Sequence, residues 1–179
     1  DATTGATPLS LMKKAISSGN ASVLDSMPSS LHLLLGNNIN GGAGTIGEVC
    51  ALALLLGLAF MLWKKIITWH IPVSIILSAF VFASVLHIAN PIYADPISVV
   101  LTGGMMLGAI FMATDYTTSP MTRRGQLIYG TAIGLLTIVI RNWGAYPEGM
   151  SFAILIMNAF TPLINNYCKP KRFGEVLKK

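Results

Sequence analysis

Charged side chains are scarce in this sequence, since Asp, Glu, Lys and Arg make up only 11% of its 179 residues. A soluble globular domain usually carries about 25% charged residues. Hydrophobic residues make up 53% of the chain, and the mean hydropathy is +0.65. These residues occur in long blocks instead of alternating with polar ones. The composition therefore excludes an ordinary soluble domain and predicts a chain that lies mostly in lipid.

Metal-ligating side chains are also few, with two cysteines and three histidines. No CxxC or HxxxH spacing occurs, so we expect no zinc, haem or iron–sulfur site built by this chain alone. Cys50 and Cys168 lie at the ends of different apolar blocks. The topology that the charge pattern predicts places them on opposite membrane faces, too far apart for a disulfide.

A net charge of +5 raises the question of nucleic-acid binding. The basic residues fall in short clusters between apolar blocks, which is where membrane topology places them. We therefore expect a lipid bilayer, and no nucleic acid, as the chain's surroundings.

Apolar blocks near the roughly 20 residues that a bilayer requires predict about five transmembrane helices. They cover Ile46 to Trp63, Ile71 to His87, Ile97 to Thr114, Gln126 to Ile140 and Ser151 to Tyr167. Pro162 predicts a kink or a local break near the end of the last one.

Charge asymmetry orients these spans. Basic residues follow the first, third and fifth spans, namely Lys64, Lys65, Arg123, Arg124 and five Lys or Arg in the tail 169–179. The positive-inside rule makes these connections, and the C-terminus, cytoplasmic. Residues 1–44 then lie on the outer face, residues 45–168 form the bundle, and 169–179 form a basic cytoplasmic tail. Aromatic residues near the span ends match an interfacial belt: Trp63, Trp69, Tyr93, Trp143 and Tyr167.

The segment 1–44 is rich in polar and small residues and contains one amphipathic stretch. Leu9, Met12, Ile16 and Leu24 recur at roughly helical intervals, which predicts a helix outside the hydrocarbon or along its surface. The run Leu31 to Leu35 is too short to span. The sequence begins at Asp1, without Met or a leader peptide, from which we expect an N-terminal part to be missing.

Several motifs together resemble the family of Rnf D and Nqr B subunits. The opening string DATTGATPL resembles the family's flavin-attachment motif. Further matches are GTIGE at 44–48, GGMMLGAIFMATD at 103–115, TSPMTRRGQ at 118–126, RNWGAYPEG at 141–149 and NAFTPL at 158–163. Matches over nearly the whole chain are more specific than one short motif.

The resemblance implies an all-α integral membrane protein that forms one half of an NqrB/RnfD-type, urea-transporter-like inverted-repeat bundle. It implies FMN joined to Thr7 through a phosphoester, with Asp1, Gly5 and Ala6 in the attachment site, and an external flavin transferase. It also implies a longer N-terminal membrane half, a second noncovalent riboflavin in some members, and other flavin- and iron–sulfur-carrying subunits as partners.

The implied function is electron relay in a complex of the inner or cytoplasmic membrane that moves Na⁺ or H⁺. The reaction would be ferredoxin to NAD⁺ for Rnf, or NADH to quinone for Nqr. The alternatives are a urea-transporter-like channel without a redox group, since the fold alone does not imply electron transfer, and a structural anchor with an empty motif.

Thr7 also has a purely structural interpretation. Thr before Pro8 is an ordinary helix start, with the hydroxyl as N-cap and proline at the first helical position. The two interpretations are compatible, because a phosphate at a helix N-terminus meets free N–H groups. Gly5 and Ala6 remove bulk beside the hydroxyl, so that the segment can enter the cleft of a transferase.

Two further polar groups are candidates for flavin contacts. Thr45, Gly47 and Glu48 could line a flavin, although glycines before a span are also ordinary linkers. Asp115 and Thr118 lie in a group of oxygen-bearing side chains that could bind a cation or a flavin ring, or could simply cap chain reversals.

The remaining polar and small residues have mainly structural interpretations. Gly103, Gly104 and Gly108 favour close helix packing over contact with a flat ring, and Arg141 is expected to snorkel to the interface. Polar groups on the last span need partners: Asn158, Asn165 and Asn166. Asn165 stands where the family often has Asp, so we expect no ion coupling through an acid there.

Overall fold

The computed structural model describes residues 7–36 and 50–169, which are mostly helical and contain no strand. The outer elements are α1 (Pro8–Ser18), the 3-10 helix η1 (Ala21–Ser26) and α2 (Ser30–Leu35). The longer elements are α3 (Ala51–Trp63), α4 (His70–Ala89), α7 (Arg123–Trp143) and α8 (Met150–Tyr167). Between α4 and α7 lie α5 (Pro96–Leu101), α6 (Met105–Leu107) and a π-helical turn, η2 (Gly108–Met112).

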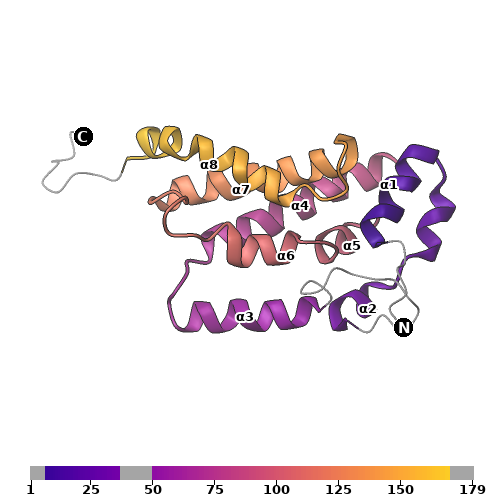
Figure 1. Ribbon diagram of the computed structural model, residues 1–179, viewed down its shortest axis with the longest axis horizontal. Coiled ribbons are helices and arrows are strands. Elements are labelled where there is room, and N and C mark those ends of the chain that lie inside the picture. Colours follow the sequence, from indigo (N-terminus) through magenta and orange to yellow (C-terminus); the bar gives the residue numbers. More distant parts are fainter. Residues whose placement is uncertain (1–6, 37–49, 170–179) are drawn as a thin grey trace, which may run out of the picture.

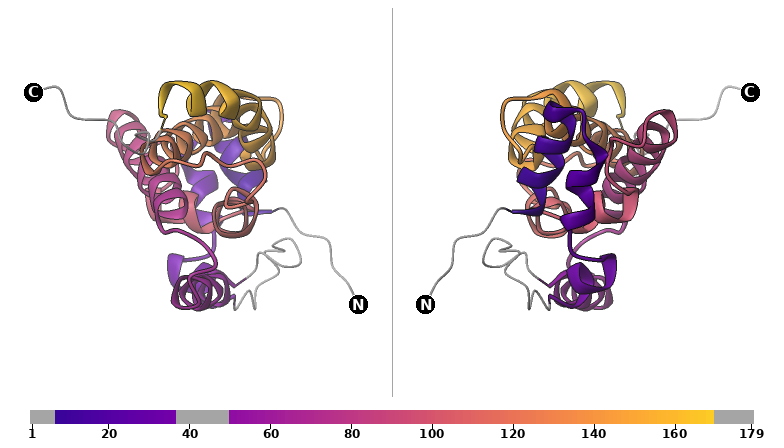
Figure 2. Two further views of the ribbon diagram at one scale, coloured as in Figure 1. Left: turned by 90° about the vertical axis from the view of Figure 1, so that its left-hand side faces the viewer. Right: turned by 90° about the vertical axis from the view of Figure 1, so that its right-hand side faces the viewer.

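The long helices run along the long axis of the molecule, with α1 and α2 gathered at one end (Figure 1). Helix α7 packs between α4 and α8 and makes the largest interface of the fold with α4. Helix α3 lies at the periphery, as the end-on views show (Figure 2). Its Gly57 faces the ring of Phe111.

Two glycines on α7 allow it to lie very close to α4. A Cβ atom built on Gly130 would overlap Ser74 Oγ, and one built on Gly134 would overlap Ser78 Oγ and lie 2.6 Å from the Ile75 carbonyl oxygen. Small residues four positions apart permit this backbone approach in membrane helices. This close contact was not among the predictions from the sequence, although the spacing of the two glycines indicates it.

The core lies along the α4–α7–α8 contact. Tyr129 and Ile133 of α7 are fully buried against Ile71 and Ile75 of α4. Outward-facing apolar side chains remain exposed along the long helices, including Leu56, Phe60, Leu77, Leu155 and Phe160. Such a surface is unusual for a protein in water and typical of one covered by lipid or partner helices.

By length and hydropathy, α4 is the one described helix suited to crossing a bilayer, while α3 is apolar but shorter. The 21 residues of α7 include Arg123, Arg124 and Arg141, which lower its apolar character. Composition alone is therefore weak evidence for the number of spans.

Most of the predicted spans correspond to observed helices. The second and fifth predictions match α4 and α8 closely. The fourth was too short, because α7 begins at Arg123 and thus contains the two arginines that we placed before the helix. The first helix begins at Ala51, and residues 46–49 of that prediction lie outside the described part. Helix α8 continues through Pro162, so the predicted local break was wrong.

The prediction of one continuous third span was also wrong. The chain from 97 to 114 forms α5, a break at residues 102–104, then α6 and η2. Gly103 has φ +68°, a left-handed conformation that interrupts a right-handed helix. The apolar block thus contains two short helical pieces.

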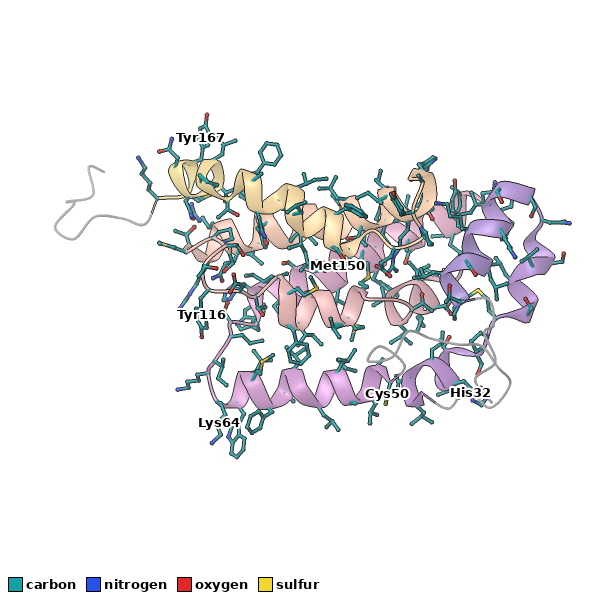
Figure 3. The ribbon with its side chains drawn as sticks, viewed as in Figure 1. His32, Cys50, Lys64, Tyr116, Met150 and Tyr167 are labelled. Atoms are coloured by element: carbon teal, nitrogen blue, oxygen red, sulfur yellow. The ribbon has the colours of Figure 1, made fainter. Side chains whose placement is uncertain are left out.

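Basic connections gather at one end of the bundle. Lys64 after α3, Tyr116 before α7 and Tyr167 at the end of α8 lie at the end opposite His32 and Cys50 (Figure 3). This alternation agrees with the up-and-down order used to orient the chain. Cys50 and Cys168 are both free.

Candidate functional site

Thr7 is the N-cap of α1. Its backbone is extended (φ −67°, ψ 149°), and its Oγ1 accepts a hydrogen bond from the Ser10 amide at 3.3 Å. Pro8 occupies the first helical position, where its missing N–H costs nothing. The structural interpretation of this motif is therefore confirmed, and the partly exposed Thr7 hydroxyl lies at the N-terminus of an 11-residue helix.

Helix α1 is amphipathic, as predicted, with Met12 and Ala15 buried. It ends at Ser18 because Gly19 adopts a left-handed conformation, so Leu24 belongs to the separate element η1 and not to the same stripe. Lys13 Nζ donates a hydrogen bond of 2.6 Å to the Gly144 carbonyl after α7. This bond ties the helix that begins at Thr7 to the end of α7.

A narrow cleft lies between α1 and the bundle. Apolar side chains form most of its lining, and its polar groups come from Lys13, Tyr93, Arg141 and Asn142. Leu9 of α1 reaches toward the break in the third span, since a Cβ on Gly103 would overlap its Cδ1 atom. The candidate attachment helix thus rests directly on the broken helix.

Arg141 contradicts our expectation of a snorkelling side chain, because its side chain is only 4% exposed. Its Nη1 donates to the Val99 carbonyl (2.7 Å) and its Nη2 donates to the Thr102 carbonyl (3.1 Å). These carbonyls lie at the end of α5, where helical partners run out. The guanidinium takes the place of the missing donors.

Glu148 completes this group of contacts from the loop between α7 and α8. Its Oε1 lies 3.2 Å from Arg141 Nη2, and its Oε2 accepts from the Gly104 amide at 3.1 Å. Oε1 also accepts from the Met150 amide at the start of α8. The ion pair therefore joins the two sides of the break to the ends of α7 and α8.

Glycines near the break allow the close packing that we predicted for this stretch. A Cβ on Gly103 would overlap Glu148 and lie 2.9 Å from Arg141 Nη2, while a Cβ on Gly108 would lie 2.5 Å from Met150 Cγ. Helix packing thus accounts for Gly108, and backbone conformation accounts for Gly103.

Asp115 and Thr118 lie far from Thr7. The loop that contains them, marked by Tyr116, is at the end of the molecule opposite α1 (Figures 1 and 3). Asp115 accepts hydrogen bonds from the hydroxyls of Thr117 and Thr118, and that from Thr117 holds the pKa of its carboxyl below the ordinary value. These contacts favour the interpretation as a local cap, and they place no flavin carried by Thr7 beside this group.

Two of the three asparagines on α8 have the partners that their position requires. Asn158 Oδ1 accepts from the fully buried Tyr129 hydroxyl at 2.5 Å, and Asn165 Oδ1 accepts from the Met121 amide at 3.2 Å. Among the described residues, no cluster of His, Cys, Asp and Glu could hold a metal ion. Several predicted flavin contacts lie outside the described residues: Asp1, Gly5, Ala6, Thr45, Gly47 and Glu48.

These features define an α-helical protein with a lipid-facing surface, a capped surface helix and a broken helix beneath it. Residues 1–174 match the model of the NQR2, RnfD, RnfE family, and the chain belongs to this family. The resemblance inferred from the sequence motifs is thereby confirmed.

Curated relatives carry consistent names. The chain is 46% identical over 174 residues to the D subunit of the Na⁺-translocating ferredoxin:NAD⁺ oxidoreductase complex of Acetobacterium woodii, covering 97% of this chain and 50% of that protein. It is 38% identical over 175 residues to the proton-translocating counterpart of Clostridium ljungdahlii, covering 97% and 52%. It is 37% identical over 178 residues to the D subunit of the ion-translocating oxidoreductase complex of Stutzerimonas stutzeri, covering 98% and 49%. The chain thus spans about half the length of these relatives.

The roles of Arg141 and Glu148 were not predicted from the sequence. Their spacing of seven residues across a loop carries no recognised signal, and a single arginine near a span end is usually interfacial. One signal was available, since Gly103 and Gly104 inside an apolar block are also what a helix break requires.

Proposed function

We propose that this chain is the flavin-carrying half of a D subunit in an Rnf-type, ion-translocating ferredoxin:NAD⁺ oxidoreductase, with FMN esterified to Thr7. The single observation that carries the attachment site is the Thr7 hydroxyl at the N-terminus of α1, within the family-typical DATTGAT string. The bound isoalloxazine would supply the redox chemistry, and the protein would supply attachment, orientation and electrostatics.

The geometry around Thr7 fits a phosphoester. The hydroxyl is partly exposed, so it is open to the external flavin transferase that must activate this weak nucleophile. An ester phosphate at this position would meet the first free amide of α1, that of Leu9, because Pro8 has none. The helix dipole also favours negative charge at this end.

We further propose that the chain crosses the inner or cytoplasmic membrane about five times as one half of a urea-transporter-like inverted repeat. The broken α5–α6 segment would be the interrupted span of this half. The end of the bundle with Lys64 and Arg123 would face the cytoplasm, and α1 with Thr7 would lie on the outer face. The C-terminal tail would be cytoplasmic.

The proposed partners follow from the relatives' names. Flavin- and iron–sulfur-carrying subunits of an Rnf-type complex would exchange electrons with the FMN, and Na⁺ or H⁺ would be the coupled ion, since one relative is named Na⁺-translocating and another proton-translocating. A second, noncovalent riboflavin remains part of the proposal. None of the described residues identifies its contacts.

The other functions have less support. The three relatives are named as oxidoreductase subunits, which favours electron transfer over a non-redox channel or a structural anchor. Two of the names specify ferredoxin and NAD⁺, which favours an Rnf-type over an Nqr-type parent.

Covalent flavin can be tested in cells that also make the transferase. We expect the denatured protein to fluoresce under ultraviolet light in a gel, and the peptide that contains Thr7 to carry the mass of FMN less one water. Thr7→Ala should abolish both signals. The motif offers a matched control, because Thr4 presents a hydroxyl three residues away and Thr4→Ala should keep the flavin.

Two outcomes would overturn the assignment. One is an unmodified Thr7 peptide in the presence of an active transferase, and the other is loss of flavin in Thr4→Ala with retention in Thr7→Ala. Accessibility of the tether to a membrane-impermeant protease in spheroplasts tests its placement on the outer face, and protection there would contradict the orientation.

A further inference from the structure

The break in the third span brings three oxygen atoms together around one positive group. The carbonyl oxygens of Val99 and Thr102 lie 2.7 and 3.1 Å from the guanidinium nitrogens of Arg141, and Glu148 Oε1 lies 3.2 Å from Nη2. All three acceptors are hard oxygen ligands, two neutral and one anionic. This donor set is of the kind that binds small cations, and in broken transporter helices the freed carbonyls bind Na⁺.

The Arg141 side chain is 4% exposed, so its charge is almost completely removed from water. Burying an ion is costly unless other groups compensate, and one carboxylate together with two helix-end carbonyls provides that compensation. Its Nε–H has no acceptor among the described residues, so the guanidinium is not held by a complete set of hydrogen bonds. The attraction between its charge and the surrounding oxygens determines where it lies.

We propose that the break in the third span is a monovalent-cation position whose resident cation is the guanidinium of Arg141. While Arg141 is in place, a cation from solution has no room to bind there, and the coupled ion must cross the protein by another route. Glu148 belongs to the same position, because it neutralises the charge and fixes the Gly104 amide on the far side of the break.

This inference goes beyond the proposed flavin relay and does not depend on it. It concerns oxygen atoms from α5 and the loop before α8, and it would hold whether or not Thr7 carries FMN. The tests are accordingly separate, because flavin attachment is measured by fluorescence and the cation position by thermal stability.

The experiment removes the tethered cation and offers a free one. The purified full-length protein in detergent is melted in NaCl and in choline chloride at equal ionic strength, as wild type and as Arg141→Ala. We expect the variant to have a lower Tm in choline chloride. Addition of Na⁺ should raise the variant's Tm by roughly 3–6 °C more than that of wild type at ten times the dissociation constant.

Two variants show whether the extra shift comes from this position. In Arg141→Ala with Glu148→Gln, the anionic ligand is lost, and the extra Na⁺ response should disappear. In Arg124→Gln, an arginine at the other end of α7 is neutralised, and the response should equal that of wild type. The proposal is overturned if Arg141→Ala shows no Na⁺ response beyond wild type, or if the double variant keeps it.

A second comparison applies if Arg141→Ala does not fold. Arg141→Lys keeps a cation, whereas Arg141→Met keeps similar bulk without charge. We expect the lysine variant to melt at a higher temperature than the methionine variant, and to show no Na⁺ response beyond wild type. A methionine variant at least as stable as the lysine variant would mean that the position does not require a cation, and would overturn the proposal.

Discussion

The close packing of α7 on α4 leads to a prediction that separates backbone contacts from side-chain contacts. Ser74 and Ser78 of α4 each oppose one glycine of α7, Gly130 and Gly134 respectively. Adding a methyl group to either glycine creates an overlap with a serine hydroxyl. Only the methyl group on Gly134 also meets the Ile75 carbonyl oxygen, at 2.6 Å, and a backbone atom cannot rotate away.

The magnitude follows from these contacts. Overpacking a tight interface costs typically 1–3 kcal/mol, and alanine regains up to about 1 kcal/mol of helix propensity relative to glycine. For Gly134→Ala the helices must separate, so we expect a net loss of about 1–2 kcal/mol, which lowers the Tm by roughly 2–8 °C. For Gly130→Ala the nearest backbone oxygen, that of Ile71, is 3.0 Å away, so most of the cost lies in the Ser74 hydroxyl.

The assay is a double-mutant cycle measured by thermal unfolding of the purified protein. Ser74→Ala should restore Gly130→Ala to within about 0.5 kcal/mol of Ser74→Ala alone, whereas Ser78→Ala should leave most of the Gly134→Ala loss in place. Equal rescue at both positions would refute the reasoning, because it would mean that the Ile75 carbonyl does not limit the approach of the helices. A Gly134→Ala variant as stable as wild type would refute it as well.

Further predictions concern the break, the core and the loop. Gly103→Ala forces a left-handed backbone on alanine, at a cost of about 1–2 kcal/mol before overlaps, and should lower the Tm measured by thermal unfolding. Tyr129→Phe leaves the Asn158 oxygen without a donor and should cost about 1–3 kcal/mol, with partial recovery when Asn158→Leu is added in the same assay. Thr117→Val should raise the pKa of Asp115 toward its ordinary value, as followed by titration of its carboxyl carbon resonance. Because the pKa of Asp115 is lowered in the fold, its contribution to stability is complete above the ordinary carboxyl pKa and is lost as the pH falls through the lowered value; the variant should lose this dependence, and an unchanged profile would contradict it.

The order and type of the helices could be predicted from the sequence with fair accuracy. Long apolar blocks identified α4 and α8, and the Thr-Pro pair identified the start of α1, because these signals are local. The beginning of α7 was misplaced by three residues, since charged residues at a membrane surface can lie inside a helix as readily as before it. The motif strings were sufficient for the family, which the family model confirms.

The sequence by itself determined the apolar, helical character of the chain, its family, and the hydroxyl at Thr7 that caps α1. Only the tertiary structure decided that the third apolar block breaks at Gly103 and that Arg141 and Glu148 join its two pieces. The physical reason is that composition records how much of a segment prefers lipid, whereas a buried ion pair depends on charges that meet in space. The carbonyls freed by the break have no partner in their own segment, and the arginine that satisfies them lies some forty residues further along the chain.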